Sequence, residues 1–82
     1  MNNTPQIRQF ITSNFYVPAA DGLPDDASLL DRGIIDSTGV MEVVEFLQQT
    51  FGIRVEDEDL LPENLDSIAR IDAFVARKKG AG

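Results

Sequence analysis

Three stretches of apolar residues at helical spacing restrict this chain to a small helical fold. Side chains three and four positions apart lie on one face of an α-helix, so each stretch predicts an amphipathic helix. The chain has 82 residues, enough for one domain with a small core. We therefore expect an all-α fold and a single domain over residues 1–82, in which three main helices and one or two short ones form a small antiparallel bundle. The apolar positions are Ile7, Phe10, Ile11 and Phe15, then Val40, Val43, Val44, Leu47 and Phe51, then Leu65, Ile68, Ile71, Phe74 and Val75.

Capping residues and prolines predict the limits of the first helix. Thr4 is a suitable N-cap, and Pro5 would occupy the first helical position, where its missing N–H costs nothing. Val17-Pro18 ends the helix, because the residue before a proline avoids helical backbone angles. The connection over residues 18–36 is long for so small a domain, which indicates local structure or function. We expect a short helical turn near Ala27–Leu30.

The second and last helices are bounded in the same way. The second begins at Ser37 or Thr38 and ends at Phe51, where Gly52 supplies the left-handed residue that often follows a helix. One or two helical turns are expected within Glu56–Leu61. The last helix is predicted to start at an Asn64 cap, and its final turn carries Arg77, Lys78 and Lys79, whose charges suit the helix dipole.

Acidic residues dominate the middle of the chain. Between Asp21 and Asp66 there are 13 acidic residues and two basic ones, and the whole chain carries a net charge of −7. Such a surface repels phosphate backbones, so a nucleic acid partner is not expected, whereas basic protein surfaces would be attracted. No apolar run approaches the roughly 20 residues that cross a bilayer. We expect a cytoplasmic protein without a membrane partner.

The chain has no cysteine and no histidine, which removes most of the side chains used in catalysis. A thiolate nucleophile, an imidazole base and the usual zinc ligands are all absent. Ser37 as a hydrolase nucleophile would lack a triad partner. The carboxylates of Glu56–Asp59 lack the glycine and the spaced glutamate of a calcium loop. No catalytic residue and no metal site is predicted, and the residue pattern alone favours Ser37 as an N-cap.

A wider pattern around Ser37 resembles the acyl carrier proteins, including the stand-alone peptidyl and aminoacyl carriers. It consists of Gly33-Ile34-Ile35-Asp36-Ser37, an amphipathic helix, the segment Phe51-Gly52-Ile53 to Asp59, and a final helix, and it covers about residues 7 to 77. The resemblance implies that Ser37 receives 4′-phosphopantetheine from coenzyme A through a phosphopantetheinyl transferase. Acyl or aminoacyl intermediates of fatty acid or secondary metabolite biosynthesis would then be held on this arm as thioesters. The chain itself would not be an enzyme.

The resemblance also implies a set of partner-binding residues and a monomer. Asp36 would help the transferase recognise the serine. The second helix would present a surface to basic patches on acyl- or aminoacyl-activating ligases or synthases, and the acidic segment after it would extend that surface. The core helices would part to shelter an attached chain in some members of the family. The implied partner-binding residues are Asp36, Thr38, Met41, Glu42, Glu45, Glu56, Asp57 and Asp59.

Thr38-Gly39 departs from the family pattern, in which leucine or another large apolar residue commonly follows the serine. Glycine in a first turn costs about 1 kcal/mol of helix propensity, so it loosens the helix start or lets the backbone of a partner protein approach closely. This departure favours a specialised discrete carrier, loaded by an AMP-forming activating enzyme. The alternative is an unmodified interaction module that binds a basic partner through its acidic helix face.

Overall fold

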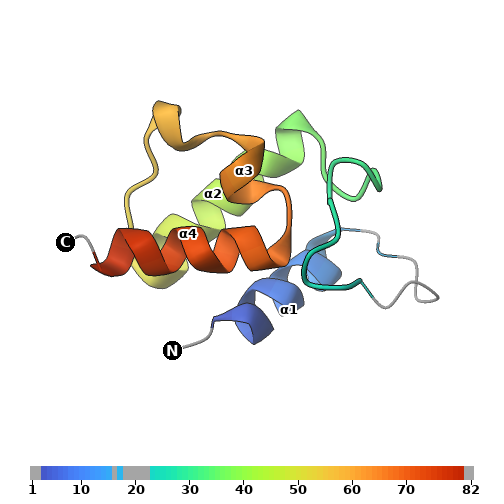
Figure 1. The fold of residues 1–82 in the computed structure, drawn as a ribbon, viewed down its shortest axis with the longest axis horizontal. Coiled ribbons are helices and arrows are strands. Elements are labelled where there is room, and N and C mark those ends of the chain that lie inside the picture. Colours follow the sequence, from blue (N-terminus) through green and yellow to red (C-terminus); the bar gives the residue numbers. More distant parts are fainter. Residues whose placement is uncertain (1–2, 16, 18–22, 81–82) are drawn as a thin grey trace.

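The computed structural model describes residues 3–15, 17 and 23–80, and the regular elements within them are all helical. The long helices are α1 (Thr4–Asn14), α2 (Ser37–Phe51) and α4 (Ile68–Gly80), as Figure 1 shows. The short elements between α2 and α4 are the 3₁₀ turn η2 (Asp57–Asp59) and the one-turn helix α3 (Pro62–Leu65). The predicted all-α fold with three main helices and two short ones is confirmed.

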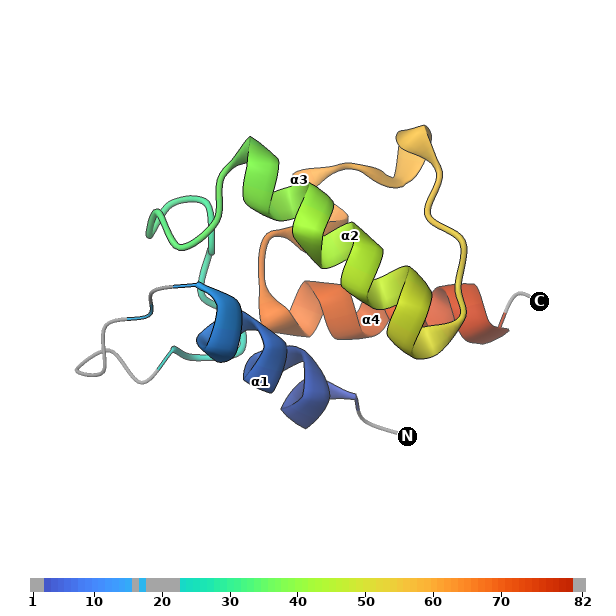
Figure 2. The same cartoon turned by 180° about the vertical axis from the view of Figure 1, so that it is seen from behind.

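The direction of the helices determines which segments meet. Figures 1 and 2 show that α1 runs opposite to α2, whereas α2 and α4 run in the same general direction. The segment between α2 and α4 must therefore return along the molecule, and η2 and α3 lie on this return path. As a result α3 and the start of α4 lie at the same end of the molecule as the start of α2.

The helix α1 differs from the prediction at both ends. Thr4 is its first residue and not its cap, because the backbone N–H of Asn3 is held by Asp72 Oδ1 at 2.9 Å and the carbonyl of Asn3 begins the helical hydrogen bonds. The helix ends at Asn14, before the predicted stop. Phe15 turns into an extended conformation and its ring packs edge-on against Phe10 at 6.0 Å. Pro18 of the predicted stop lies outside the described residues.

The predicted last helix is divided in two. Asn64 lies inside α3, where its buried amide donates to the carbonyl of Asp59 at 2.9 Å and accepts from Arg77 at 2.8 Å. The cap of α4 is instead Ser67, whose hydroxyl accepts the N–H of Arg70 at 3.1 Å. The prediction of Asn64 as the cap is wrong, because hydrogen bonds with Asp59 and Arg77 use its side chain.

The core extends beyond the three predicted stripes into the long connection. Hydrogen-bonded turns, such as the one from Ser28 to Arg32, replace the helical turn expected there. This connection buries Leu23, Leu29, Ile34 and Ile35 beside the apolar faces of the helices. Its ordered turns follow from this burial, since an apolar side chain of this size stabilises a fold by about 1.5–3 kcal/mol when buried. No helix of the described residues is both long and apolar enough to cross a membrane.

Candidate functional site

The start of α2 is capped by Asp36. This residue has an extended backbone, its Oδ1 accepts the N–H of Gly39 at 2.9 Å, and its carbonyl accepts the N–H of Val40 at 2.9 Å. A carboxylate here satisfies a free backbone donor and faces the positive end of the helix dipole. Ser37 is therefore the first helical residue, and its interpretation as the N-cap is wrong.

Ser37 is exposed, and its hydroxyl forms no hydrogen bond with any residue that the structure describes. The capping bond of Asp36 explains why: Asp36 already accepts the backbone N–H at the start of the helix that a serine cap would otherwise accept. The hydroxyl is thus held on a rigid helix end while remaining free to react. These properties fit the attachment of a covalent group to Ser37.

Gly39 is a point of close approach between α2 and neighbouring segments. It is buried, and a Cβ atom at this position would lie 3.0 Å from Cε1 of Phe15 and 3.1 Å from Cβ of Ile35. The departure of Thr38-Gly39 from the family pattern therefore has a structural reason within the chain. The close approach that glycine permits here is made by the chain's own Phe15 and Ile35.

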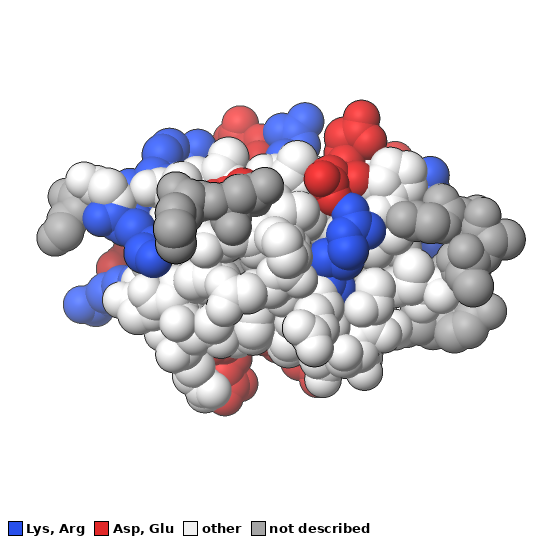
Figure 3. Space-filling view, turned by 90° about the horizontal axis from the view of Figure 1, so that it is seen from below, with Lys and Arg blue, Asp and Glu red and all other residues white. Residues whose placement is uncertain are grey.

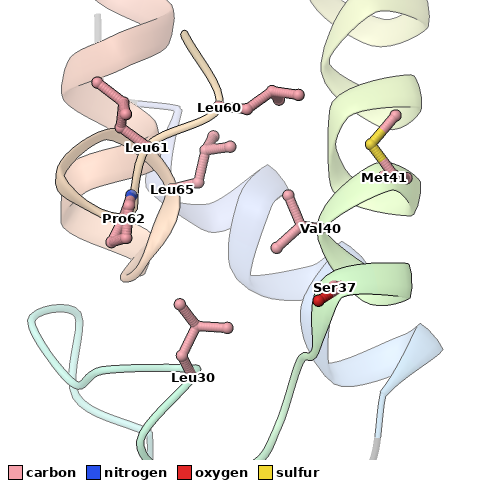
Figure 4. A pocket seen from close by; sticks show the side chains of 8 residues that line it. All are labelled: Leu30, Ser37, Val40, Met41, Leu60, Leu61, Pro62 and Leu65. Carbon is pink, nitrogen blue, oxygen red and sulfur yellow. The ribbon is translucent and has the colours of Figure 1, made fainter. Parts of the chain in front are cut away.

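An apolar pocket of about 290 Å³ opens beside Ser37. Figure 4 shows α2 on one side of it, residues 60–65 on the opposite side, and Leu30 closing one end. No charged side chain lines this pocket, so it suits an apolar group attached to Ser37. The lining residues are Leu30, Ser37, Val40, Met41, Leu60, Leu61, Pro62 and Leu65.

The large exposed apolar side chains of the described residues all belong to this pocket. They are Leu30, Met41 and Leu61, with 38%, 54% and 43% of their surface accessible. Exposed apolar groups that gather around a hollow mark a binding surface more clearly than single ones do. Sequence analysis found Met41 but missed Leu30 and Leu61, because only the fold brings them together. The pair Leu60-Leu61 after an acidic run was the available signal.

The predicted acidic residues do not form one continuous group. Glu42 and Glu45 are exposed on α2, and together with Phe10 and Phe46 they line a hollow of about 240 Å³ between α1 and α2. Neither carboxylate forms an ion pair with a residue that the structure describes. Figure 3, seen from the α1 side, shows a largely uncharged face with one basic side chain beside acidic groups near its middle and further charged groups toward the margins. Glu42 and Glu45 are thus available to an external cation.

The acidic segment around η2 is partly engaged within the chain. Asp59 pairs with Lys78 at 2.7 Å and its carboxylate also accepts the N–H of Glu56 at 3.0 Å. The bond from Lys78, followed by that from Glu56, lowers the pKa of Asp59 below its ordinary value of 3.8. Glu56 pairs with Arg54 at 2.9 Å, while Asp57 is exposed. Asp59 is therefore the least available of the predicted partner-binding residues.

Comparison with known proteins identifies the family. Residues 5–75 match the family described as "Phosphopantetheine attachment site". The chain belongs to the acyl carrier protein family. The predicted resemblance is confirmed, and so is the cofactor, since the matched domain is the one to which 4′-phosphopantetheine is attached. Members of this family carry intermediates between partner enzymes and do not catalyse reactions themselves, which agrees with the prediction that the chain is not an enzyme.

Several carrier proteins are similar over most of the chain. A probable acyl carrier protein, PigG, of a Serratia species is 28% identical over 84% of this chain and 79% of its own length. An acyl carrier protein of Solidesulfovibrio magneticus is 26% identical over 98% of this chain and 99% of its own. A D-alanyl carrier protein of Abiotrophia defectiva is 29% identical over 68% and 71%. The carriers similar to this chain thus have names that refer to different cargoes.

Proposed function

We propose that Ser37 is the residue to which 4′-phosphopantetheine is attached, and that the chain carries acyl groups as thioesters between separate enzymes. The observation that carries this proposal is the free, exposed hydroxyl of Ser37 on a helix end that Asp36 already caps. When bound, the arm would supply the thiol that a chain without cysteine lacks. We further propose a monomeric cytoplasmic carrier that forms a single domain over residues 1–82.

The attachment reaction needs only the serine oxygen from this chain. Ser37 Oγ would form a new bond to the phosphorus that bears pantetheine in coenzyme A, the diphosphate bond would break, and the nucleotide would leave. The serine proton would pass to a base of the transferase, since the chain has no histidine to accept it. Asp36 is exposed beside this hydroxyl and would contact the transferase, together with the exposed Thr38.

The apolar pocket supports an acyl cargo with an apolar chain. It lies directly beside Ser37 and contains no charged side chain that would favour a free amino or carboxylate group. A chain folded into it would lose contact with water and gain roughly 25 cal/mol for each Å² of apolar surface buried. Met41 at the rim would contact either this cargo or a partner enzyme. Aminoacyl cargo would remain outside the pocket, on the arm.

The acidic surfaces support partner enzymes with basic docking sites. Glu42 and Glu45 lie within three turns of Ser37 on the same helix, so an enzyme bound there would reach the arm. Glu56, Asp57 and Asp59 would add a second acidic surface, with Asp59 contributing the least because Lys78 neutralises it. We propose acyl- or aminoacyl-activating ligases or synthases as these partners. The close packing at Gly39 is with residues of the same chain, so it does not favour one of these classes of partner enzyme over another.

The test is the intact mass of the chain before and after incubation with coenzyme A, magnesium and a broad-specificity phosphopantetheinyl transferase. We expect a gain of one phosphopantetheine group in the natural chain and none in Ser37→Ala. Thr50→Ala is the matched control, since it removes an exposed hydroxyl near the other end of α2 and should be modified normally. Absence of any gain in a folded chain would make the protein an unmodified interaction module.

A further inference from the structure

Asp66 links the end of α3 to the connection that leads to Ser37. Its Oδ2 accepts the hydroxyl of Ser28 at 2.7 Å, and its Oδ1 accepts the N–H of Leu30 at 3.0 Å. Its backbone carbonyl accepts the N–H of Leu29 at 2.7 Å. One residue therefore holds three consecutive residues that are 36 to 38 positions away in the sequence.

The turn that Asp66 holds carries one end of the apolar pocket. Figure 4 shows the Leu30 side chain directed toward the space that Val40 and Pro62 border. The hydroxyl of Ser28 donates to Asp66 and accepts the N–H of Asp31 at 3.0 Å, so Asp66 also orients the group that closes this turn. Leu30 is 38% exposed, and its own packing therefore holds it only in part.

The wall of the pocket formed by residues 60–65 is also joined to Asp66. The N–H of Asp66 donates to the carbonyl of Pro62 at 2.9 Å and ends α3, the helix that places Pro62 and Leu65 in the lining. The main chain of Asp66 thus belongs to one wall, and its carboxylate holds Leu30 at the end of the pocket. The α2 wall, with Val40 and Met41, has no bond to Asp66 among those that the structure describes.

We propose that Asp66 is a positioning residue that sets the distance between Leu30 and α3, and thereby the size of the apolar group that the pocket accepts beside Ser37. The reference to a group on Ser37 rests on the proposed function, whereas the effect of Asp66 on the pocket does not. Without the carboxylate, the bond from the N–H of Leu29 to the carbonyl of Asp66 is the described hydrogen bond that still joins this turn to the end of α3. The pocket then loses a fixed end and accepts apolar groups with less selectivity.

The first experiment uses the unmodified chain, with its methyl groups observed by NMR in buffer with and without dissolved xenon. Xenon enters apolar cavities and shifts the methyl signals that line them. We expect shifts at Leu30, Val40 and Leu65 in the natural chain. In Asp66→Ala the shift at Leu30 should be lost while the shifts at Val40 and Leu65 remain. The amide of Leu30 should also exchange its hydrogen about fivefold faster, since it loses one hydrogen bond.

Three further variants separate positioning from general stability. Asp66→Asn keeps an acceptor for Leu30 and gains a donor for Ser28, so it should restore the xenon response. Asp72→Ala is the control. It removes a carboxylate of α4 that accepts the N–H of Asn3, a residue outside the pocket lining, and should leave the xenon response of Leu30 unchanged. Ser28→Ala removes one of the two side-chain bonds and should give a partial loss, which keeps the test decisive should Asp66→Ala fail to fold.

An unchanged Leu30 response in Asp66→Ala, or an equal loss in Asp72→Ala, would overturn the proposal. A second arm then relates the pocket to cargo: the transferase is supplied with acetyl- or octanoyl-coenzyme A, and the methyl spectra of the two products are compared. The octanoyl product should shift Leu30 in the natural chain and less than half as much in Asp66→Ala. No mass gain in this arm would contradict the proposed function, while the xenon result would still decide the role of Asp66.

Discussion

At the scale of single residues, the start of α2 divides its tasks among neighbours. Asp36 satisfies the helix end, Ser37 presents a free hydroxyl, and Gly39 lets Phe15 and Ile35 pack against the first turn. The sequence indicated that Ser37 was special and that a glycine near it was unusual. It could not indicate which residue capped the helix, because aspartate and serine are equally good caps and are adjacent here. Nor could it indicate what packs on Gly39, since those contacts depend on the fold.

The packing at Gly39 leads to a prediction with two opposing terms. Gly39→Ala gains about 1 kcal/mol of helix propensity but forces a methyl group against Phe15 and the Cβ of Ile35, which costs about 1–3 kcal/mol. Ile35 is buried and cannot move away easily. We expect the free energy of unfolding to fall by roughly 1 kcal/mol in urea titrations. Thr38→Ala, at an exposed position, is the control and should be neutral or slightly stabilising. If Gly39→Ala were more stable than the natural chain, Phe15 and Ile35 would have moved to accommodate the methyl group.

At the scale of elements, η2 and α3 depend on α4 for their position. A single helical turn is not stable alone, so the bonds from Lys78 to Asp59 and from Arg77 to Asn64 hold this part of the return path. The sequence predicted turns over Glu56–Leu61, and η2 lies there. It did not predict the division of the last helix, because the apolar spacing continues from Leu65 into α4. The decisive contacts of Asn64 are made with residues five and 13 positions away.

The bond between Asp59 and Lys78 predicts how stability depends on pH. The pKa of Asp59 is lowered in the folded chain, so its ionised form favours folding above the ordinary value of 3.8, and this contribution is lost as the pH falls through the lowered pKa. Lys78→Gln should therefore be less stable than the natural chain at pH 7, and the difference should shrink below pH 3.8. Urea unfolding at a series of pH values measures this difference.

Lys79→Gln is the control for that experiment. It makes the same change of charge at the next position, where the ammonium lies 5.8 Å from the centre of the Phe51 ring and forms no ion pair with a described residue. The difference in the free energy of unfolding between Lys79→Gln and the natural chain should not vanish below pH 3.8. If Lys78→Gln and Lys79→Gln behave alike, the pH dependence comes from overall charge and not from Asp59.

At the scale of the whole molecule, the fold class followed from the spacing of apolar residues, and the broad function followed from the wider pattern around Ser37. The pocket did not, because residues 60–65 of its lining lie far along the chain from Leu30 and from residues 37–41. The net negative charge was also evident from the sequence. Which carboxylates form ion pairs and which remain free was not. Lys78 pairs with Asp59 and Arg54 with Glu56, and the first of these pairs depends on how the chain folds back over itself.

The free carboxylates predict which charges partners use. Glu42→Lys combined with Glu45→Lys should raise the KM of the transferase or of a loading ligase about tenfold at low salt, with kcat nearly unchanged, because the docking surface loses its attraction for cations. Asp26→Lys combined with Glu63→Lys changes the net charge equally at exposed positions elsewhere and is the control. Equal effects of both pairs would mean that partners respond only to net charge, and the difference should fade as salt rises.

The capping of α2 by Asp36 also bears on how enzymes would distinguish the unmodified chain from the modified one. The hydroxyl of Ser37 contributes no hydrogen bond to the described fold, so its esterification removes nothing that the helix needs. The unmodified chain and the chain that carries the bare arm would then share one backbone, and conformation would give a partner no information about attachment. An enzyme that must select the loaded form has to sense the arm itself, or the occupied pocket beneath it.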